Sequence, residues 1–325
     1  MDRKKYYSCY WLNSGIHFLK GSIRFCCYEY LHSKNLNIVV PNYRGEQLDY
    51  DRYFSLKNYY KTLAKENNIH SNCKGCIYLE EKEWDDSDFF DHFLFNHWLN
   101  CNSKCIYCEQ AYFPSQYRRQ YYDVYSVLID MKKNNLLKNT ASSCVVFGGG
   151  EPTLLSEFDR LIKLFIQENF NNIRINSSGI KYSKMLEFAL KEGSASLVIS
   201  PDSGSKYVYK QIKRVDAFDI VWKNISKYTK KSKNIDSVKA KYILIKSVND
   251  NKCEIDNFFK MCVLNGVKAV SLSVEQHWYS KEFPNMHQNV YELISYFEEK
   301  AQKLNLSVEL YCEAISILQS RRLEN

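Results

Sequence analysis

Short apolar runs alternate with longer amphipathic segments from about residue 91 to the end of the chain. The apolar runs fit buried strands, which we expect at 93–99, 144–147, 173–176, 196–200, 239–245, 267–274 and 307–311. Apolar positions between them recur with the helical period and predict helices at 116–137, 154–169, 184–191, 206–213, 217–227, 254–264 and 290–304, with a last helix after 311. This alternation favours βαβ units and a parallel sheet. The expected fold class is α/β, a partial (β/α)6-type TIM barrel.

Residues 1–90 do not follow this alternation, and they end in the acidic stretch 80–88. We therefore expect two domains, a small cysteine-containing N-terminal domain at 1–90 and the barrel at 91–325. In such barrels the chemistry takes place at the carboxyl ends of the strands. Functional residues are accordingly expected directly after the predicted strands.

Composition narrows the class of protein further. The chain has 325 residues, is 45% hydrophobic, and contains only 11 Gly and 5 Pro, which excludes a disordered protein. The net charge of +8 includes six lysines between Lys227 and Lys241, and a solvated surface explains them better than a nucleic-acid footprint. No apolar run approaches the roughly 20 residues of a membrane helix, and no secretory signal is visible. We expect a soluble, cytoplasmic protein without a membrane partner.

The 12 cysteines point to metal rather than to disulfides, because the chain is long and has no secretory signal. Three of them, Cys101, Cys105 and Cys108, have the spacing C-x3-C-x2-C, with Tyr107 before the last thiol. Three thiolates can ligate three of the four irons of a [4Fe–4S] cluster, which leaves one iron open for a ligand. The alternative is a structural zinc site completed by Glu109, His97 or a distant cysteine.

A second motif follows the predicted strand 144–147, where three glycines precede Glu151 and Pro152. This composition indicates a strand that turns sharply into a helix. Glycines there let backbone carbonyls approach a ligand closely, and the Glu151 carboxylate can accept hydrogen bonds from an ammonium group. Alternatively, Glu151 is a first-turn acid favoured by the helix dipole.

Together, the cysteine motif and the Gly149-Gly150-Glu151-Pro152 turn resemble the radical S-adenosylmethionine (radical SAM) superfamily, and the likeness extends over about 91–274. The resemblance implies a [4Fe–4S] cluster on the three cysteines, with Tyr107 and the glycine turn at the cofactor. It also implies that S-adenosylmethionine is reductively cleaved to a 5′-deoxyadenosyl radical, which abstracts hydrogen from a substrate. A flavodoxin- or ferredoxin-type protein would donate the electron.

The same resemblance assigns weaker roles to polar residues after the later strands. Ser178 lies in the turn 176–179, which departs from the family by having two serines. Ser200 and, more weakly, Asp202 would contact the cofactor ribose or carboxylate, and Lys213 would supply a cation to that carboxylate. The plainer alternatives are a serine that satisfies a strand end and a surface lysine.

A second set of cysteines precedes the barrel: Cys26 and Cys27 form one pair, and Cys73 and Cys76 form a C-x2-C pair. Two such pairs complete a four-thiolate site. The pattern resembles the SPASM or twitch segments that carry an auxiliary [4Fe–4S] cluster, although those segments follow the barrel. A zinc knuckle is the alternative, and Cys9 could replace Cys27 as a ligand.

Cys312 follows the last predicted strand, and we hypothesise that its thiol returns a hydrogen atom to a substrate radical. Because accessory clusters often accompany peptide modification in this family, a peptide or protein is the expected substrate. A carbohydrate, another small metabolite or RNA are the alternatives, as is a non-catalytic, zinc-stabilised interaction module. Residues 278–287 and the N-terminal domain are expected to shape the substrate site.

Overall fold

The computed structural model describes residues 5–26, 48–66, 68, 73, 76, 78–84, 88–113, 122–282 and 288–324. It divides into two compact units. The first contains Met1–Leu99, Gln116–Gly150 and Lys163–Ile173, and the second contains Asn100–Ser115, Glu151–Ile162 and Arg174–Asn325. The division proposed from the sequence, 1–90 and 91–325, stays a prediction.

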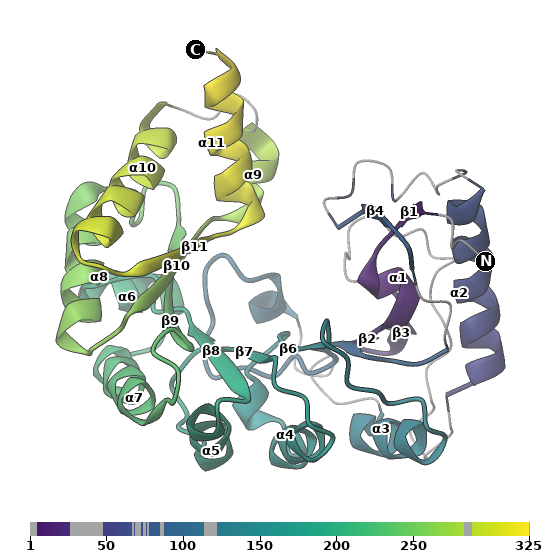
Figure 1. The fold of residues 1–325 in the computed structure, drawn as a ribbon. Coiled ribbons are helices and arrows are strands. Elements are labelled where there is room, and N and C mark those ends of the chain that lie inside the picture. The colour runs from purple at the N-terminus through teal and green to yellow at the C-terminus, as the bar shows by residue number, and fades with distance from the viewer. Residues whose placement is uncertain are drawn as a thin grey trace. The chain divides into compact units, whose positions relative to one another are not determined.

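The first unit contains a run of strands in the order β6-β5-β2-β3 (Figure 1). Strands β2 (Gly15–Leu19), β5 (His92–Asn96) and β6 (Cys144–Phe147) pair in parallel, and β3 (Ser22–Arg24) adds an antiparallel edge. The rings of Phe18, Phe95 and Phe147 stack along the three parallel strands, at centroid separations of 5.1 and 4.6 Å. A separate antiparallel pair joins β1 (Tyr6–Ser8) to β4 (Glu80–Lys82).

Three helices belong to this unit: α1 (Tyr10–Ser14), α2 (Tyr50–Lys65) and α3 (Val124–Lys133). Asp49 caps α2, whose Tyr53 donates a hydrogen bond of 2.7 Å to the Gly15 carbonyl. Helix α3 begins where Asp123 accepts from Ser126 N, and it ends before Asn135, which has a φ of 58°. The expected helix 116–137 was therefore too long at its C-terminal end, and its residues 116–121 lie outside the described residues.

The second unit has the strand order β7-β8-β9-β10-β11. The strands are β7 (Ile173–Ser177), β8 (Ala195–Ile199), β9 (Val238–Leu244), β10 (Ala269–Val274) and β11 (Ser307–Leu310), and the pairs from β8 to β11 are parallel. Helices α5 (Lys184–Glu192), α6 (Lys206–Lys213), α7 (Phe218–Lys231), α8 (Lys252–Leu264) and α10 (Gln288–Lys303) connect them (Figure 1). Helix α9 (Gln276–Glu282) follows β10, and α11 (Cys312–Glu324) follows β11.

A side-chain contact across the concave side of this sheet shows that the strands curve. Arg174 on β7 donates to both carboxylate oxygens of Glu309 on β11, at 2.7 and 3.3 Å. In a flat sheet, strands four places apart would be roughly 19 Å from each other, beyond the reach of these side chains. The α/β fold with a partial barrel is confirmed.

The glycine turn opens not into one long helix, as expected over 154–169, but into a short 3-10 helix, η5 (Pro152–Leu154), followed by α4 (Phe158–Gln167). The parallel pairing of β2 with β5 was not expected either, because 1–90 showed no alternation. None of the described helices is both long and apolar enough to cross a membrane.

Candidate functional site

The cysteine loop is held in the second unit by backbone hydrogen bonds at two points. Glu151 N donates to the Asn100 carbonyl at 2.8 Å, which fixes the start of the loop to the glutamate of the glycine turn. Lys104 N and Ile106 N donate at 3.0 Å to the carbonyls of Lys213 and Ile212, at the end of α6. The structure therefore joins three motifs that the sequence predicted to be functional: the cysteine loop, the glutamate of the glycine turn and the segment that ends in Lys213.

Two of the three thiols of this loop lie next to Ser103, a residue that was not predicted from the sequence. Its Oγ is 3.4 Å from Cys101 Sγ and 3.5 Å from Cys105 Sγ. Burial raises the pKa of the Cys101 and Cys108 thiols, and the charge of Cys105 raises both further. Lys213 lies close enough to Cys105 for their charges to interact, which contributes to the raised pKa of Lys213.

This donor set fits a [4Fe–4S] cluster, in which each cysteine ligates its own iron and the sulfurs need not surround one ion. Among the residues that the structure describes, no three His, Cys, Asp or Glu side chains surround a position for a single metal ion. Cys101, Cys105 and Cys108 are the residues that would hold the cluster.

Gly149 in the first unit explains why the turn after β6 requires glycine. Its φ is 77°, and a Cβ at this position would lie 2.6 Å from the Trp98 carbonyl oxygen. Gly150 N donates to the same carbonyl at 2.6 Å. The close approach seen in the structure is therefore between two backbone segments of the protein.

The carboxylate of Glu151 is 1% exposed and accepts four hydrogen bonds. Thr153 N, Thr153 Oγ1 and Ser177 Oγ donate to Oε1 at 3.2, 2.6 and 2.9 Å, and Ser178 N donates to Oε2 at 2.6 Å. Each carboxylate oxygen has about two lone pairs, so Oε1 is fully used, whereas Oε2 can accept one more hydrogen bond. Glu151 orders the turn in this structure, and its predicted contact with an ammonium group stays a prediction.

Ser178 connects the Glu151 turn to the cysteine loop. While its N–H binds Glu151, its Oγ donates to Asn102 Oδ1 at 2.8 Å. The structure thus brings Ser178 to the cysteine loop, as its predicted cofactor role requires.

Lys213, Asp202 and Tyr107 form a buried hydrogen-bonded triangle. The Lys213 ammonium is 3% exposed and donates to Asp202 Oδ2 and, at 2.8 Å, to Tyr107 Oη, which in turn donates to Asp202 Oδ2 at 2.7 Å. Burial is the largest single effect and lowers the pKa of Lys213, but the charges of Asp202 and Cys105 and the hydrogen bond to Asp202 together outweigh it, and the net shift is upward. Lys213 is thus a charged, paired residue and not a surface lysine.

Asp202 is itself held in an unusual backbone conformation, with a φ of 56° and no exposed surface. Its Oδ1 accepts from Ile243 N at 3.1 Å, and its carbonyl accepts from Asn249 Nδ2 at 2.8 Å. Asn249 is fully buried and also binds the backbone of Ile243 and Ile245. Asn249, in the asparagine-aspartate turn after β9, therefore fixes the backbone that positions Asp202 in the triangle.

For Ser200 and Cys312, the other two predicted site residues, the structure gives no side-chain contact with the cysteine loop among the residues it describes. Ser200 follows β8, and its N–H donates to the Ser177 carbonyl at 3.4 Å. Cys312 begins α11, and its side chain lies outside the described residues. Both roles stay predictions.

Lys241 on β9 lines a cavity of about 170 Å³ at the carboxyl ends of the strands, together with Tyr107, Tyr311 and Glu313. Its Nζ is 3.7 Å from the centre of the Tyr311 ring, and it forms no ion pair with any residue that the structure describes. Burial lowers the pKa of Lys241 to about 8. Its position among the apolar residues of the predicted strand 239–245 was the signal in the sequence that could have identified Lys241 as a functional candidate.

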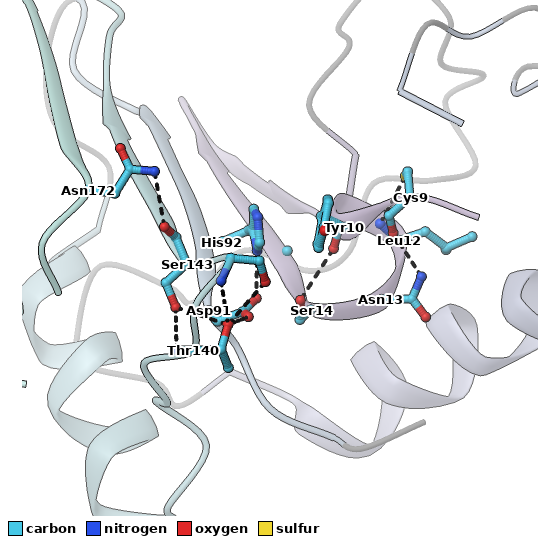
Figure 2. Close-up of polar contacts among 12 residues, drawn as sticks. Cys9, Tyr10, Leu12, Asn13, Ser14, Asp91, His92, Thr140, Ser143 and Asn172 are labelled. Carbon is cyan, nitrogen blue, oxygen red and sulfur yellow. Dashed lines mark hydrogen bonds and ion pairs between the residues drawn. The ribbon is translucent and has the colours of Figure 1, made fainter. Parts of the chain in front are cut away.

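In the first unit, four thiols from distant segments of the chain interact through their charges, but no three of the described His, Cys, Asp or Glu side chains surround a position for a single metal ion. Cys9, Cys26, Cys73 and Cys76 lie close enough for their charges to interact, which adds to burial in raising the pKa of Cys9 to about 12. Cys9 caps α1 by accepting from Leu12 N at 3.3 Å (Figure 2). Cys27 lies outside the described residues.

An orphaned cation accompanies these thiols. Lys57 on α2 is 0% exposed, and its Nζ has no hydrogen-bond partner among the described residues. It packs near the rings of Phe54 and Phe90, at 5.6 and 5.4 Å. Burial and the charge of Lys61 lower the pKa of Lys57 to about 7, against the charges of Asp88, Asp91 and Cys9, which raise it. A cluster with four thiolates would be a further anion that stabilises the ammonium.

A sequence profile of the Radical SAM superfamily matches residues 95–259. This span includes the cysteine loop, the glycine turn and the buried triangle. The chain belongs to the radical SAM superfamily, an enzyme family that uses a [4Fe–4S] cluster and S-adenosylmethionine.

Several known proteins are similar to the chain over part of its length. It is 28% identical over 166 residues to a GTP 3′,8-cyclase of Clostridium botulinum, covering 50% of this chain and 49% of that protein. It is 26% identical to a probable GTP 3′,8-cyclase of Sulfurisphaera tokodaii, covering 50% and 51%. The chain spans about half the length of these curated relatives.

Among solved structures, SuiB of Streptococcus suis bound to the precursor peptide SuiA has a TM-score of 0.54 at 13% identity, covering 82% of this chain and 65% of that one. SuiB bound to S-adenosylmethionine gives the same TM-score at 16% identity, covering 82% and 60%. These likenesses show the fold.

Proposed function

We propose that the chain is a radical SAM enzyme that abstracts hydrogen from a peptide or protein substrate, and that it carries a second, auxiliary [4Fe–4S] cluster. The observation that carries the first part is the attachment of the cysteine loop both to Glu151 and to the Lys213 end of α6. Motifs about 40 to 110 residues apart in the sequence thereby meet at one site.

The cluster and S-adenosylmethionine, when bound, supply a 5′-deoxyadenosyl radical. The chain's own residues would bind and orient the cluster and S-adenosylmethionine. Glu151 and Ser178 fix the turn expected at the cofactor ammonium, and the triangle of Tyr107, Asp202 and Lys213 holds the loop around Cys105 in place. Burial of these groups keeps water from the site.

Cys9, Cys26, Cys73 and Cys76 would hold the auxiliary cluster, with Cys27 as the alternative to Cys9. The charge interactions among the four thiols and the orphaned ammonium of Lys57 support this assignment. The chemistry of the donors also suits zinc, so metal analysis has to distinguish the two.

A peptide substrate is supported by the fold shared with SuiB, whose structure contains a precursor peptide, and by the second set of thiols. A flavodoxin- or ferredoxin-type electron donor and a cytoplasmic location belong to the same proposal, because a low-potential cluster needs a reducing compartment.

A small anionic metabolite is a second candidate substrate. The curated relatives are named for a reaction of GTP, and the unpaired ammonium of Lys241 faces a cavity beside Tyr107. An anionic group would compensate this buried charge.

The test is anaerobic reconstitution followed by addition of dithionite and S-adenosylmethionine. We expect release of 5′-deoxyadenosine by the wild-type chain and none by Cys105→Ala. Cys253→Ala is the matched control, because Cys253 is an exposed cysteine on α8 and should leave the yield unchanged. Equal yields from wild type and Cys105→Ala would refute the proposal.

A further inference from the structure

A cavity of about 270 Å³ lies wholly within the first unit, and none of the thiols described above lines it, although Tyr10 in its wall follows Cys9 directly in the chain. Its aromatic walls are Tyr10, Trp84 and Phe89, and its polar lining comes from Asn13, Ser14, Lys82, Glu83, Asp91, Thr140 and Ser142. Sites for drug-sized ligands occupy roughly 300–1,000 Å³. This cavity therefore suits a group the size of one amino-acid side chain.

The floor of the cavity carries a buried negative charge. Asp91 is 2% exposed and accepts from His92 Nδ1 at 2.6 Å and from Thr140 Oγ1 at 2.7 Å (Figure 2). Burial raises the pKa of Asp91, but the hydrogen bonds from His92, Ser14 and Thr140 and the charge of His92, which lies in ion-pair distance at 2.6 Å, together outweigh it and hold the carboxyl below its usual range. The group stays ionised at neutral pH.

Asn13 adds an unsatisfied acceptor. It is 5% exposed, and its Nδ2 donates to Ser8 Oγ at 2.7 Å and to the Cys9 carbonyl at 2.8 Å. Its Oδ1 is buried without a hydrogen-bond partner among the described residues. An unpaired buried oxygen is costly, and it calls for a donor.

The aromatic walls already attract a cation. Lys82 Nζ lies 3.8 Å from the centre of the Tyr10 ring and 4.1 Å from that of Trp84, and these two rings meet edge to face at 5.2 Å. The Lys82 ammonium is also paired with Glu80 at 2.8 Å, and its side chain is 33% exposed. It also donates a hydrogen bond of 2.6 Å to Tyr10 Oη, so Lys82 is a cation already bound at the site that a ligand would have to replace.

We propose that this cavity binds an organic cation, the ammonium or guanidinium end of a basic side chain, against the rings of Tyr10 and Trp84 in the place that Lys82 now takes, with Asp91 in the same cavity lining. Aromatic faces, an ionised carboxylate and an unpaired amide oxygen all favour a positively charged donor. Lys82 competes for the same rings. The proposal does not depend on radical chemistry.

The test is ligand-observed NMR on the full-length protein at constant ionic strength, with n-butylammonium and n-butylguanidinium as probes and n-butanol as the neutral control. We expect both cations to bind, and the one with the higher affinity shows whether the cavity prefers an ammonium or a guanidinium group. We expect n-butanol to bind at least about tenfold more weakly. Binding of n-butanol as tight as that of both cations would overturn the proposal.

Three variants of residues that line the cavity should change cation binding in opposite directions. Asp91→Asn and Trp84→Leu should each weaken cation binding by about three- to tenfold, whereas Lys82→Met should strengthen it because the resident cation is gone. Lys65→Met is the matched control, since Lys65 lies near the Tyr6 ring at 5.7 Å outside this cavity, and it should change nothing. Weaker or unchanged binding by Lys82→Met would refute the proposal even if the Asp91 and Trp84 variants failed to fold.

Discussion

Three lysines on or near β9 show how differently a buried ammonium can be compensated. Lys213 is paired with Asp202 and Tyr107, and Lys239 is paired with Glu309 at 2.8 Å. Lys241 has only the face of the Tyr311 ring and the more distant charges of Asp202 and Glu313. Its position is therefore explained better by a ligand than by the stability of the protein.

Lys241→Met should increase stability at neutral pH. The folded pKa of about 8 lies below the usual value of 10.5, so the folded state binds the proton less tightly than the unfolded state does. This costs on the order of 3 kcal/mol below pH 8, and the cost disappears as the pH rises from 8 to 10.5. Urea unfolding should show the variant more stable at pH 7 and the difference reduced at pH 10.

The control for this measurement is Lys246→Met, because Lys246 pairs with Glu282 and its side chain is 47% exposed. It should change stability by less than about 0.5 kcal/mol at either pH. If Lys241→Met destabilised the protein at pH 7, the ammonium would have a partner that compensates it.

Glu151→Gln should destabilise the protein by about 2–3 kcal/mol, although the two side chains have the same shape. Each carboxylate oxygen faces a backbone N–H, that of Thr153 on one side and that of Ser178 on the other. Whichever way the amide group of the substituted side chain points, its nitrogen opposes a donor that cannot rotate away. Thermal unfolding measures the loss.

Glu254→Gln is the matched comparison, since Glu254 is also buried and accepts several hydrogen bonds. Among the described residues, its Oε2 accepts from the Ser205 hydroxyl, at 3.0 Å. This hydroxyl can rotate and accept a hydrogen bond from an amide nitrogen instead of donating one. We expect a cost below about 1 kcal/mol. Equal effects of the two substitutions would contradict the geometric argument for Glu151.

At the scale of helices and strands, the part of the chain with regular periodicity was predicted well. The bounds of Cys144–Phe147 in the first unit and of Lys206–Lys213 in the second were predicted to the residue. Periodicity could not show that Leu155, after η5, interrupts the helix expected over 154–169. Nor could it show that Gly15–Leu19 pairs with β5, because a parallel partner about 77 residues away leaves no local signal.

Close packing between elements also escapes a sequence pattern, and Gly204 gives the sharpest case. A Cβ at this position would lie 1.9 Å from the backbone of Asn257 on α8. Gly204→Ala should therefore cost more than about 4 kcal/mol, because the loop before α6 would have to separate from α8. Chemical denaturation of the variant measures this cost.

Gly266→Ala separates backbone strain from this steric effect. Gly266 has a φ of 72°, but a Cβ there would meet nothing closer than 3.8 Å. The expected cost is about 1–2 kcal/mol, the penalty of a left-handed conformation alone. A Gly204→Ala variant as stable as Gly266→Ala would mean that α6 and α8 are not packed as described.

At the scale of the whole molecule, the sequence identified the residues with distinctive spacing and missed those defined only by folding. The cysteines, Glu151 and the family could be read from two short motifs. Ser103, Lys241 and the partnership of Lys213 with Asp202 depend on which strand ends meet, and spacing does not encode that. The same limit applies to the first unit, where Cys9 was only an alternative ligand, although its charge interacts with those of Cys26, Cys73 and Cys76.

Two separate metal sites predict separable iron contents. The reconstituted wild-type chain should contain about eight irons, and a variant with alanine at Cys101, Cys105 and Cys108 should retain about four. Cys73→Ala should lose the other four. Cys9→Ala should behave like Cys73→Ala, whereas Cys27→Ala should keep all of the iron, since the charge of Cys9 interacts with those of the other three thiols. Iron analysis and electron paramagnetic resonance of the reduced proteins measure both losses. The reverse pattern for Cys9 and Cys27 would assign the fourth ligand to Cys27, and zinc in the triple variant would make the site in the first unit structural.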